Sequence, residues 1–207
     1  EEDILTSQNL IQQGTVIEKL LQALIVDKSI KINDMLLGDK NAIMVATRIL
    51  GYGKDYNFTY DGIEQTVDLS TLEPVELDMS KCPKGKNEFE FTLPNSERKI
   101  TFRLLIGDDE NQIAAEIKAR EKISTEQSFE LTTRLKQMIL SVDGKSETTY
   151  INNFVDNEFL SVDSYEFRKY LTSITPDIDM SATIKESTGK ETVITVPITV
   201  RFFWPSA

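Results

Sequence analysis

The sequence predicts an α+β fold in which antiparallel hairpins are segregated from a helical cluster, with a β-hairpin at the C-terminus. Apolar residues recur at helical spacing in some stretches and alternate with polar residues in others, and these stretches come in separate blocks. Each block of alternation contains its own turn signal, which indicates antiparallel pairing. The strand–helix–strand order of a doubly wound sheet is missing, so the pattern argues against a parallel sheet.

We expect the 207 residues to form one domain, because a chain of this length can bury a core without disulfide bonds or metals. Its predicted parts are a helical region over 1–50, hairpins over 54–105, a helical insertion over 107–175 and the C-terminal hairpin over 180–205. Within the first region, a short helix is expected from Thr6 or Ser7 to Gly14.

The most strongly specified stretch is a helix that feeds directly into a hairpin, over residues 37–69. We expect Asp39 to cap the helix, because its carboxylate can accept hydrogen bonds from the first turn. Arg48 falls in the last turn, where a cation meets the negative end of the helix dipole. Gly51 and Gly53 end the helix, because glycine adopts positive φ without a steric penalty. The inward face is predicted to be Ile43, Ala46, Ile49 and Leu50.

The first hairpin is predicted from its alternation and its turn. Tyr56, Phe58 and Tyr60 alternate with polar residues, so they share one face of a strand. Asp61-Gly62 is typical of a two-residue type I′ turn, and the return strand follows it.

The remaining elements follow in order along the chain. A second hairpin is predicted from about Glu88 to Leu105. Four helices are expected after it, each opened or closed by a capping or breaking residue. The first opens at the acidic triplet 108–110, and the second runs from Phe129 to the Asp143-Gly144 turn. The third begins near Tyr150. The fourth begins at Asp163 or Ser164 and has Pro176 beyond its end.

The C-terminal segment combines strand alternation with a cluster of aromatic residues. Ile194, Val196, Ile198 and Val200 alternate with polar residues, and Pro197 favours an edge strand. Continued alternation would place Phe202 and Trp204 on the core face and Phe203 on the opposite face, beside Arg201. The aromatics either fill the protein's own core or dock on a partner, since termini fray unless something holds them.

Composition excludes several classes of function. The net charge is −11, and such a field repels nucleic acid and anionic membranes. No apolar run approaches the length of a membrane span, and no basic segment of a signal peptide is visible. The chain has no histidine and one cysteine, which removes histidine-based catalysis, histidine metal ligands and any intramolecular disulfide.

The motifs with possible chemistry are weak. S-x-x-K occurs at 96–99 and 187–190, but both copies fall in predicted turns and neither has the companion K-T-G. Asp177 and Asp179 could share a cation, but the calcium-loop pattern is absent. Cys82 has lysine neighbours and no histidine. We therefore expect no enzyme activity, no metal, no cofactor and no small-molecule substrate.

Three segments resemble the baseplate hub assembly proteins of T-even-type contractile-tailed phages. The first is the helix with Arg48 that runs into Gly51-Tyr52-Gly53 and a tyrosine-containing strand. The second runs from Phe102 through Arg103 and two leucines to Gly107, before an acidic helix start. The third is the ending, Val196-Pro197-Ile198 followed by Phe202-Phe203-Trp204-Pro205. Family members often carry cysteine pairs in the hairpin turns, and this chain does not, so the resemblance implies no zinc here.

The resemblance implies a non-enzymatic component of the phage tail baseplate, made in the host cytoplasm and built into the virion through contacts with other tail or baseplate proteins. The alternative is a transient cytosolic chaperone or adaptor that is absent from the mature particle. A third class, an enzyme using only carboxylates and lysines, would need a pocket with two convergent carboxylates. The candidate partner-interface residues are Phe203, Pro205, Arg201 and Tyr52.

Overall fold

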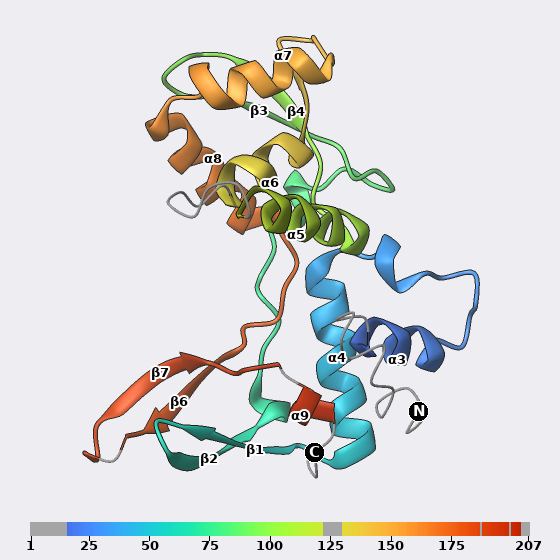
Figure 1. Cartoon of the computed structure of the whole chain (residues 1–207), viewed down its shortest axis with the longest axis vertical. Helices are drawn as coiled ribbons and strands as arrows, with labels where there is room; N and C mark the ends of the chain where they lie inside the picture. Colours follow the sequence, from blue (N-terminus) through green and yellow to red (C-terminus); the bar gives the residue numbers. More distant parts are fainter. Residues whose placement is uncertain (1–15, 122–129, 187, 199, 204–207) are drawn as a thin grey trace. The chain divides into compact units, whose positions relative to one another are not determined.

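The chain folds into two compact units, which we describe separately (Figure 1). The computed structural model describes residues 16–121, 130–186, 188–198 and 200–203. Unit 1 combines the residues up to Val75 with those from Pro176 onward, and unit 2 is the intervening stretch 76–175. The sequence predicts one domain with a helical insertion over 107–175. The inserted unit instead begins before the second hairpin, which therefore belongs to unit 2.

The predicted α+β class with antiparallel hairpins is confirmed. In unit 1, helices precede a first hairpin, and a second hairpin follows the insertion. The elements of unit 1 are α3 (Val16–Leu24), a 3₁₀ turn (Ile32–Asp34), α4 (Leu37–Tyr52), β1 (Asp55–Tyr60), β2 (Ile63–Asp68), a 3₁₀ turn (Leu69–Thr71), β6 (Ser181–Lys185), β7 (Glu191–Thr195) and α9 (Val200–Phe203). The predicted helix over 6–14 lies outside the described residues.

Helix α4 ends at Gly53 as predicted, but Gly51 lies inside the helix and the helix begins differently. Gly53 terminates it with φ 81°, and its N–H donates to the Ile49 carbonyl at 3.0 Å. Asp39 is not the N-cap, because the cap position is Leu36 and Asp39 lies within the first turn. Placing Leu50 on the inward face was also wrong, since its side chain is 87% exposed.

The buried stripe of α4 runs at intervals of four residues through Lys40, Met44 and Arg48. The first and last residues of this stripe are cationic, so the spacing of apolar residues does not indicate it. Lys40 pairs with Glu18 of α3 at 3.2 Å. Arg48 bonds backbone carbonyls instead, and this arrangement is described with the site below.

The first hairpin of unit 1 has the register that its turn dictates. Asp61 and Gly62 have φ 49° and 77°, as a type I′ turn requires, and Tyr60 pairs with Ile63. The rings of Tyr56 and Phe58 stack with centroids 5.4 Å apart, so the prediction that they share a face is confirmed. Gln65 of β2 donates to the Lys185 carbonyl of β6 at 2.8 Å, and the two hairpins lie side by side (Figure 1).

The core of unit 1 is built only from residues outside the insertion. It joins α3, α4 and the first hairpin to residues that follow Pro176 in sequence. Its buried members are Val16, Leu20, Leu21, Ile32, Met44, Val45, Tyr56, Val67, Leu69, Met180, Ile184, Val196, Phe202 and Phe203.

The two segments that lead into and out of the insertion pair with each other inside unit 1. Pro74 and Ile178 form an antiparallel bridge. The N–H of Val75 donates to the Asp177 carbonyl, and the N–H of Asp179 donates to the Glu73 carbonyl, both at 2.9 Å. The ends of the insertion are therefore held next to each other, as in domain insertions that leave the host fold intact.

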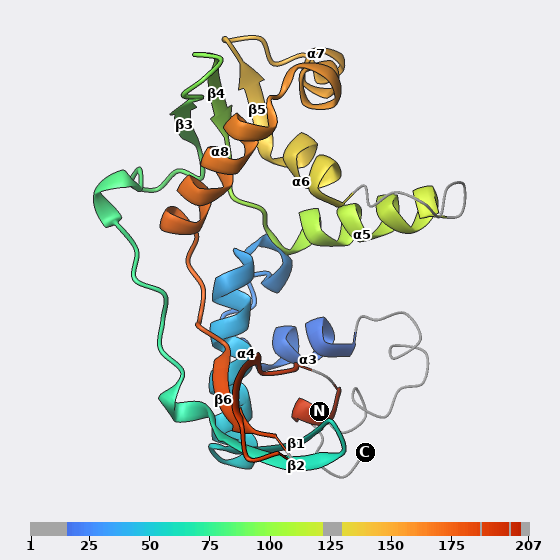
Figure 2. The same ribbon diagram turned by 90° about the vertical axis from the view of Figure 1, so that its left-hand side faces the viewer.

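Unit 2 is a three-stranded antiparallel sheet, in the order β3-β4-β5, with helices packed around it (Figure 2). Its elements are a 3₁₀ turn (Met79–Lys81), β3 (Phe89–Thr92), β4 (Lys99–Phe102), α5 (Gly107–Glu121), α6 (Glu130–Met138), β5 (Ile139–Val142), α7 (Thr148–Asn153), a π-helical turn (Phe154–Glu158) and α8 (Ser161–Ile174). Aromatic contacts fix α8 on one face of the sheet. Phe102 of β4 meets Phe167 of α8 edge-on at 4.8 Å, and Phe91 of β3 stacks on Tyr170 at 4.7 Å.

The predicted helix from Phe129 to Asp143 is wrong in its second half. The described helix ends at Met138, and β5 follows without a break. Ile139 and Val142 are buried in the sheet core, where β5 pairs with β4. Asp143 and Gly144 do end the element, but as a turn with φ 51° and 78°. A short apolar run fits either period, and pairing with β4 decides for the strand.

The predicted strand through Phe203 is also wrong. Strand β7 ends at Thr195, before Pro197, and residues 200–203 form the helical turn α9. Proline has no N–H for a ladder hydrogen bond, so the strand stops there. The predicted alternation of Phe202 and Phe203 is lost, and both side chains are buried.

Gly38 should be the least replaceable glycine of α4. A Cβ at this position would lie 1.8 Å from the Pro176 carbonyl oxygen, where the chain returns from the insertion. We expect Gly38→Ala to lower the free energy of unfolding by about 3 kcal/mol. Gly51 is the matched control, because it is helical and a Cβ there meets nothing within 4 Å. Gly51→Ala should raise stability by about 0.5–1 kcal/mol. Equal effects in denaturant unfolding would contradict the contact.

Unit 1 should fold without unit 2, because its core takes no residue from 76–175. Replacing residues 76–175 by Asn-Gly would join Val75 to Asp177 through the three-residue loop Asn-Gly-Pro176 and would turn the pairing of Glu73–Val75 with Asp177–Asp179 into a hairpin. We expect the shortened chain to unfold in one cooperative transition and to give dispersed amide resonances. A chain without a transition would show that unit 1 depends on the insertion.

Candidate functional site

Two of the four predicted interface residues meet in one pocket of unit 1. Tyr52, at the end of α4, and Phe203, in α9, line the same cavity, whose volume is ≈ 360 Å³. Pro205 and the side chain of Arg201 lie outside what the structure describes. We call this cavity the α3–α4 pocket.

The α3–α4 pocket is mainly apolar. Helix α3 supplies two leucines, the last turns of α4 supply most of the remainder, and α9 closes one side. The lining residues are Leu20, Leu24, Thr47, Leu50, Gly51, Tyr52 and Phe203. At the edge of the pocket, Leu50 is 87% and Tyr52 is 49% exposed. A leucine so exposed beside an apolar cavity is typical of a surface that another group covers.

Arg48 fixes the end of α4 and with it the position of Tyr52. Its guanidinium donates to the carbonyls of Gly53 at 2.8 Å and Asp55 at 3.0 Å, across the helix-to-strand connection. The same group lies 5.4 Å from the ring centre of Tyr52 and 5.9 Å from that of Tyr56. Burial lowers the pKa of Arg48, while Tyr56 and Tyr52 oppose the shift. Arginine stays protonated under such shifts, so a buried cation braces the site.

Tyr56 contacts the segment that carries Phe203. Its hydroxyl donates to the Pro197 carbonyl at 3.0 Å, and its ring meets that of Phe202 edge-on at 4.9 Å. Phe202 in turn contacts Phe203 edge-on at 5.2 Å. The first strand of the hairpin therefore anchors the segment that carries Phe203 to the pocket.

Phe203 does not face outward as strand alternation predicted. Only 1% of its surface is exposed, because a helical turn sends Phe202 and Phe203 into the same core. The prediction that Phe203 contacts a partner assumed that its side chain is exposed, and this assumption is wrong. Tyr52 keeps its half-exposed position, and its assignment to an interface stays a prediction.

Sequence reasoning missed the other side of the pocket. Helical spacing places Leu20 and Leu24 on one face of α3. Leu50 follows Arg48, which is buried, and Ile49, which is partly buried, but Leu50 itself is exposed. The signal available was its place beside Gly51, at a helix end where the inward face can no longer be covered.

A second and larger hollow lies on the open face of the sheet of unit 2, with a volume of ≈ 540 Å³. Its lining alternates polar and apolar residues, and Thr101 and Ser141 share a hydrogen bond across it at 2.6 Å. A hollow on a solvent-facing sheet surface does not indicate a ligand site, because antiparallel sheets commonly have one face in contact with water.

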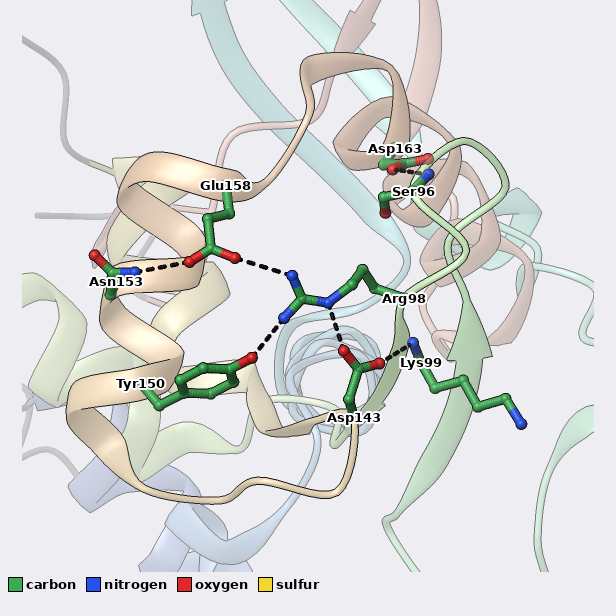
Figure 3. A network of polar contacts seen from close by, with 8 residues as sticks. All are labelled: Ser96, Arg98, Lys99, Asp143, Tyr150, Asn153, Glu158 and Asp163. Atoms are coloured by element: carbon green, nitrogen blue, oxygen red, sulfur yellow. Dashed lines mark hydrogen bonds and ion pairs between the residues drawn. The ribbon is translucent and has the colours of Figure 1, made fainter.

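The densest polar network of unit 2 is centred on Arg98 of the β3–β4 turn (Figure 3). Its guanidinium donates to Asp143 at 2.5 Å, to Glu158 at 2.9 Å and to the Tyr150 hydroxyl at 2.7 Å. The bond to Glu158 is the main cause that raises the pKa of Arg98. Each acidic group of the network is bonded to a donor, which is the arrangement of a structural clamp.

Asp163, in the first turn of α8, clamps the same turn from its other side (Figure 3). Its carboxylate accepts from the N–H of Asn95 at 2.8 Å, the Asn95 amide at 3.0 Å and the N–H of Ser96 at 3.0 Å. Burial alone would raise the pKa of Asp163, but the hydrogen bonds from Ser96 and Asn95 hold it below its usual range. The side chain is fully buried and serves the turn.

The other chemical candidates are engaged in local structure. Asp177 accepts from the side-chain amide of Asn41 in α4, and Asp179 accepts from the Ser181 N–H two residues on, so each carboxylate is bonded within the fold. In the S-x-x-K copy at 96–99, Ser96 lies in the β3–β4 turn as expected and Lys99 begins β4, whereas Ser187 of the other copy lies outside the described residues. Among the described residues, no group of three or more histidine, cysteine, aspartate or glutamate side chains could hold a metal ion.

In the part of the chain that the structure describes, no helix has the length and apolarity to span a membrane.

Comparison of the chain with models of known families, with curated proteins and with solved structures finds no match.

Asp163→Asn should destabilise unit 2 by about 2–3 kcal/mol, because it replaces a charged acceptor of two backbone N–H groups. The control is Asp156→Asn, which removes the exposed ion pair with Lys136 and should cost less than about 1 kcal/mol. The contribution of Asp163 is present above about pH 4 and is lost as the pH falls through its lowered folded-state pKa. Thermal unfolding from pH 3 to 7 measures this, and equal losses for both variants would refute the clamp.

Proposed function

We propose that the chain is a non-enzymatic structural or assembly component of a phage tail baseplate, in the hub region. In this proposal it is made in the host cytoplasm, enters the virion and acts through contacts with other tail or baseplate proteins. The resemblance of its three segments to hub assembly proteins supplies the phage context.

The observation that carries the proposal is the exposed apolar end of α4. Leu50 and Tyr52 project at the edge of the α3–α4 pocket, while Arg48 beneath them is held by hydrogen bonds to two carbonyls. Surfaces that combine a rigid support with an exposed aliphatic and an exposed tyrosine are favourable for protein contacts, because little entropy is lost on binding. We assign this end of α4 to contact with a second baseplate protein.

A transient chaperone or adaptor remains the alternative. It would use the same surface but would leave before the particle matures. Copy number in the mature particle separates the two roles, since a structural component is present at a fixed stoichiometry.

The experiment compares purified tails that carry the unaltered chain, Leu50→Lys or Val26→Lys. Val26 is the control, because it is also apolar and exposed in unit 1 but does not line the pocket. Quantitative mass spectrometry should find a fixed number of copies per tail for the unaltered chain and for Val26→Lys. Leu50→Lys should reduce incorporation about tenfold or more, because removing a central contact costs about 2 kcal/mol.

Absence of the unaltered chain from mature tails, with its presence on assembly intermediates, would favour the chaperone. Its absence from both, or equal incorporation of the two variants, would contradict the proposed function or the assigned surface respectively. Circular dichroism of each purified variant shows that reduced incorporation does not come from unfolding.

A further inference from the structure

Strand β7 forms the outer edge of the second hairpin of unit 1. The other strand of this hairpin, β6, faces β2, whose Gln65 side chain donates to the Lys185 carbonyl (Figure 1). Val193, in the middle of β7, is 66% exposed. We propose that β7 pairs antiparallel with β7 of a second copy of this chain, about a two-fold axis at Val193.

The hydrogen bonds of the hairpin show which backbone groups of β7 point outward. Hydrogen-bonded pairs alternate with non-hydrogen-bonded pairs along an antiparallel ladder. The N–H of Val196 donates to the Met180 carbonyl at 2.8 Å, and the N–H of Glu186 donates to the Lys190 carbonyl at 2.9 Å. The N–H and C=O groups that point away from β6 are therefore those of residues 191, 193 and 195. Among the described residues, none bonds these outward groups.

The edge of β7 lacks the features that usually keep strand edges from pairing. Its register with β6 runs without a shift, so it has no β-bulge. It contains no proline and no lysine. Its central residues, Thr192, Val193 and Ile194, are β-branched and favour a strand. A regular edge of this kind is a template for pairing with another strand.

Only one two-fold register uses all three outward positions. With the axis at Val193, this residue pairs with its own counterpart, and Glu191 of each copy pairs with Thr195 of the other. A shift by two residues in one direction brings in Gly189, which lies in the turn with φ 79°. A shift in the other direction brings in Pro197, which has no N–H to donate. The turn and the proline therefore fix both the length and the register of the pairing.

The side chains also match across this axis. The two Val193 side chains would meet at the axis, where each covers surface that is exposed in the single chain. Glu191 is the only charged residue of β7 and would lie opposite a threonine, so no like charges face each other. A second copy therefore supplies a strand of matching length, hydrogen-bonding pattern and charge.

The pairing goes beyond the proposed function. It uses residues 191–195 and not the end of α4, so failure of one assignment leaves the other standing. It requires nothing of Trp204, which lies outside the described residues. Dimerisation is a property of the purified chain and can be measured without any tail protein.

Sedimentation equilibrium of the purified full chain over a range of concentrations tests the pairing. Physiological ionic strength screens the repulsion between copies of net charge −11. We expect a reversible monomer–dimer equilibrium. Val193→Lys and Val193→Glu should each weaken the dimer several-fold, because like charges would meet at the axis. An equimolar mixture of these two variants should restore the dimer, because opposite charges then meet there.

A backbone variant tests the ladder itself. Val193→Pro removes an N–H that β6 does not use, so it should spare the hairpin. It should weaken the dimer about tenfold or more, because both donors of the central pair are lost. The matched control is Thr183→Lys, at the exposed residue of β6 that pairs with Val193, and it should leave the dissociation constant almost unchanged. Circular dichroism checks that each variant is folded.

An unaltered chain that stays monomeric at every concentration would overturn the proposal. A dimer that Val193→Pro and the charged variants leave unchanged would also overturn it, because the copies would then meet elsewhere. If the charged variants weaken the dimer and their mixture does not restore it, the axis at Val193 is wrong. The charged pair keeps the test valid if Val193→Pro fails to fold, since lysine and glutamate leave the backbone N–H in place.

Discussion

The close approach of the chain to Gly38 is the constraint on which unit 1 depends. The Pro176 carbonyl lies where any side chain at position 38 would be, and Asn41 of the same helix bonds Asp177 at 2.9 Å. At this point the residues after the insertion rejoin the helix that precedes it. The entropy cost of closing a loop grows only slowly with the length of the loop. One close contact and a short antiparallel pairing are therefore enough to join the two parts of unit 1. The core of unit 1 therefore contains residues of α4 together with Phe202, which lies near the other end of the sequence.

Features set by neighbouring residues could be predicted from the sequence. Gly53 and the Asp61-Gly62 turn carry their conformation in their own φ angles, and the structure confirms both. Features set by distant contacts could not be predicted. Strand β5 exists because β4 pairs with it, and the buried stripe of α4 includes cations whose partners lie elsewhere in the fold. The boundary of the insertion depends on Val75 bonding Asp177, which no local pattern indicates.

Part of the candidate site was predicted, but the reasons for choosing its residues were incomplete. Tyr52 and Phe203 do meet, although one was expected in a helix-end motif and the other on the outer face of a strand. What brings them together is Pro197, which ends β7 and allows the chain to turn into α9. The apolar character of the ending was the useful signal. The geometry of this segment could not be predicted, because it depends on which side chain fills which space in the core.

The two sides of the α3–α4 pocket are joined by one continuous set of contacts. Arg48 lies against the rings of both Tyr52 and Tyr56, and Tyr56 touches Phe202, which touches Phe203. The guanidinium is fixed by two carbonyls, so movement of either tyrosine would expose or misplace a buried cation. This cost keeps the pocket in one shape before anything enters it. A preformed apolar cavity binds a side chain without first ordering its walls, and the end of α4 therefore meets the physical requirement for a contact surface more fully than the polar networks of unit 2 do.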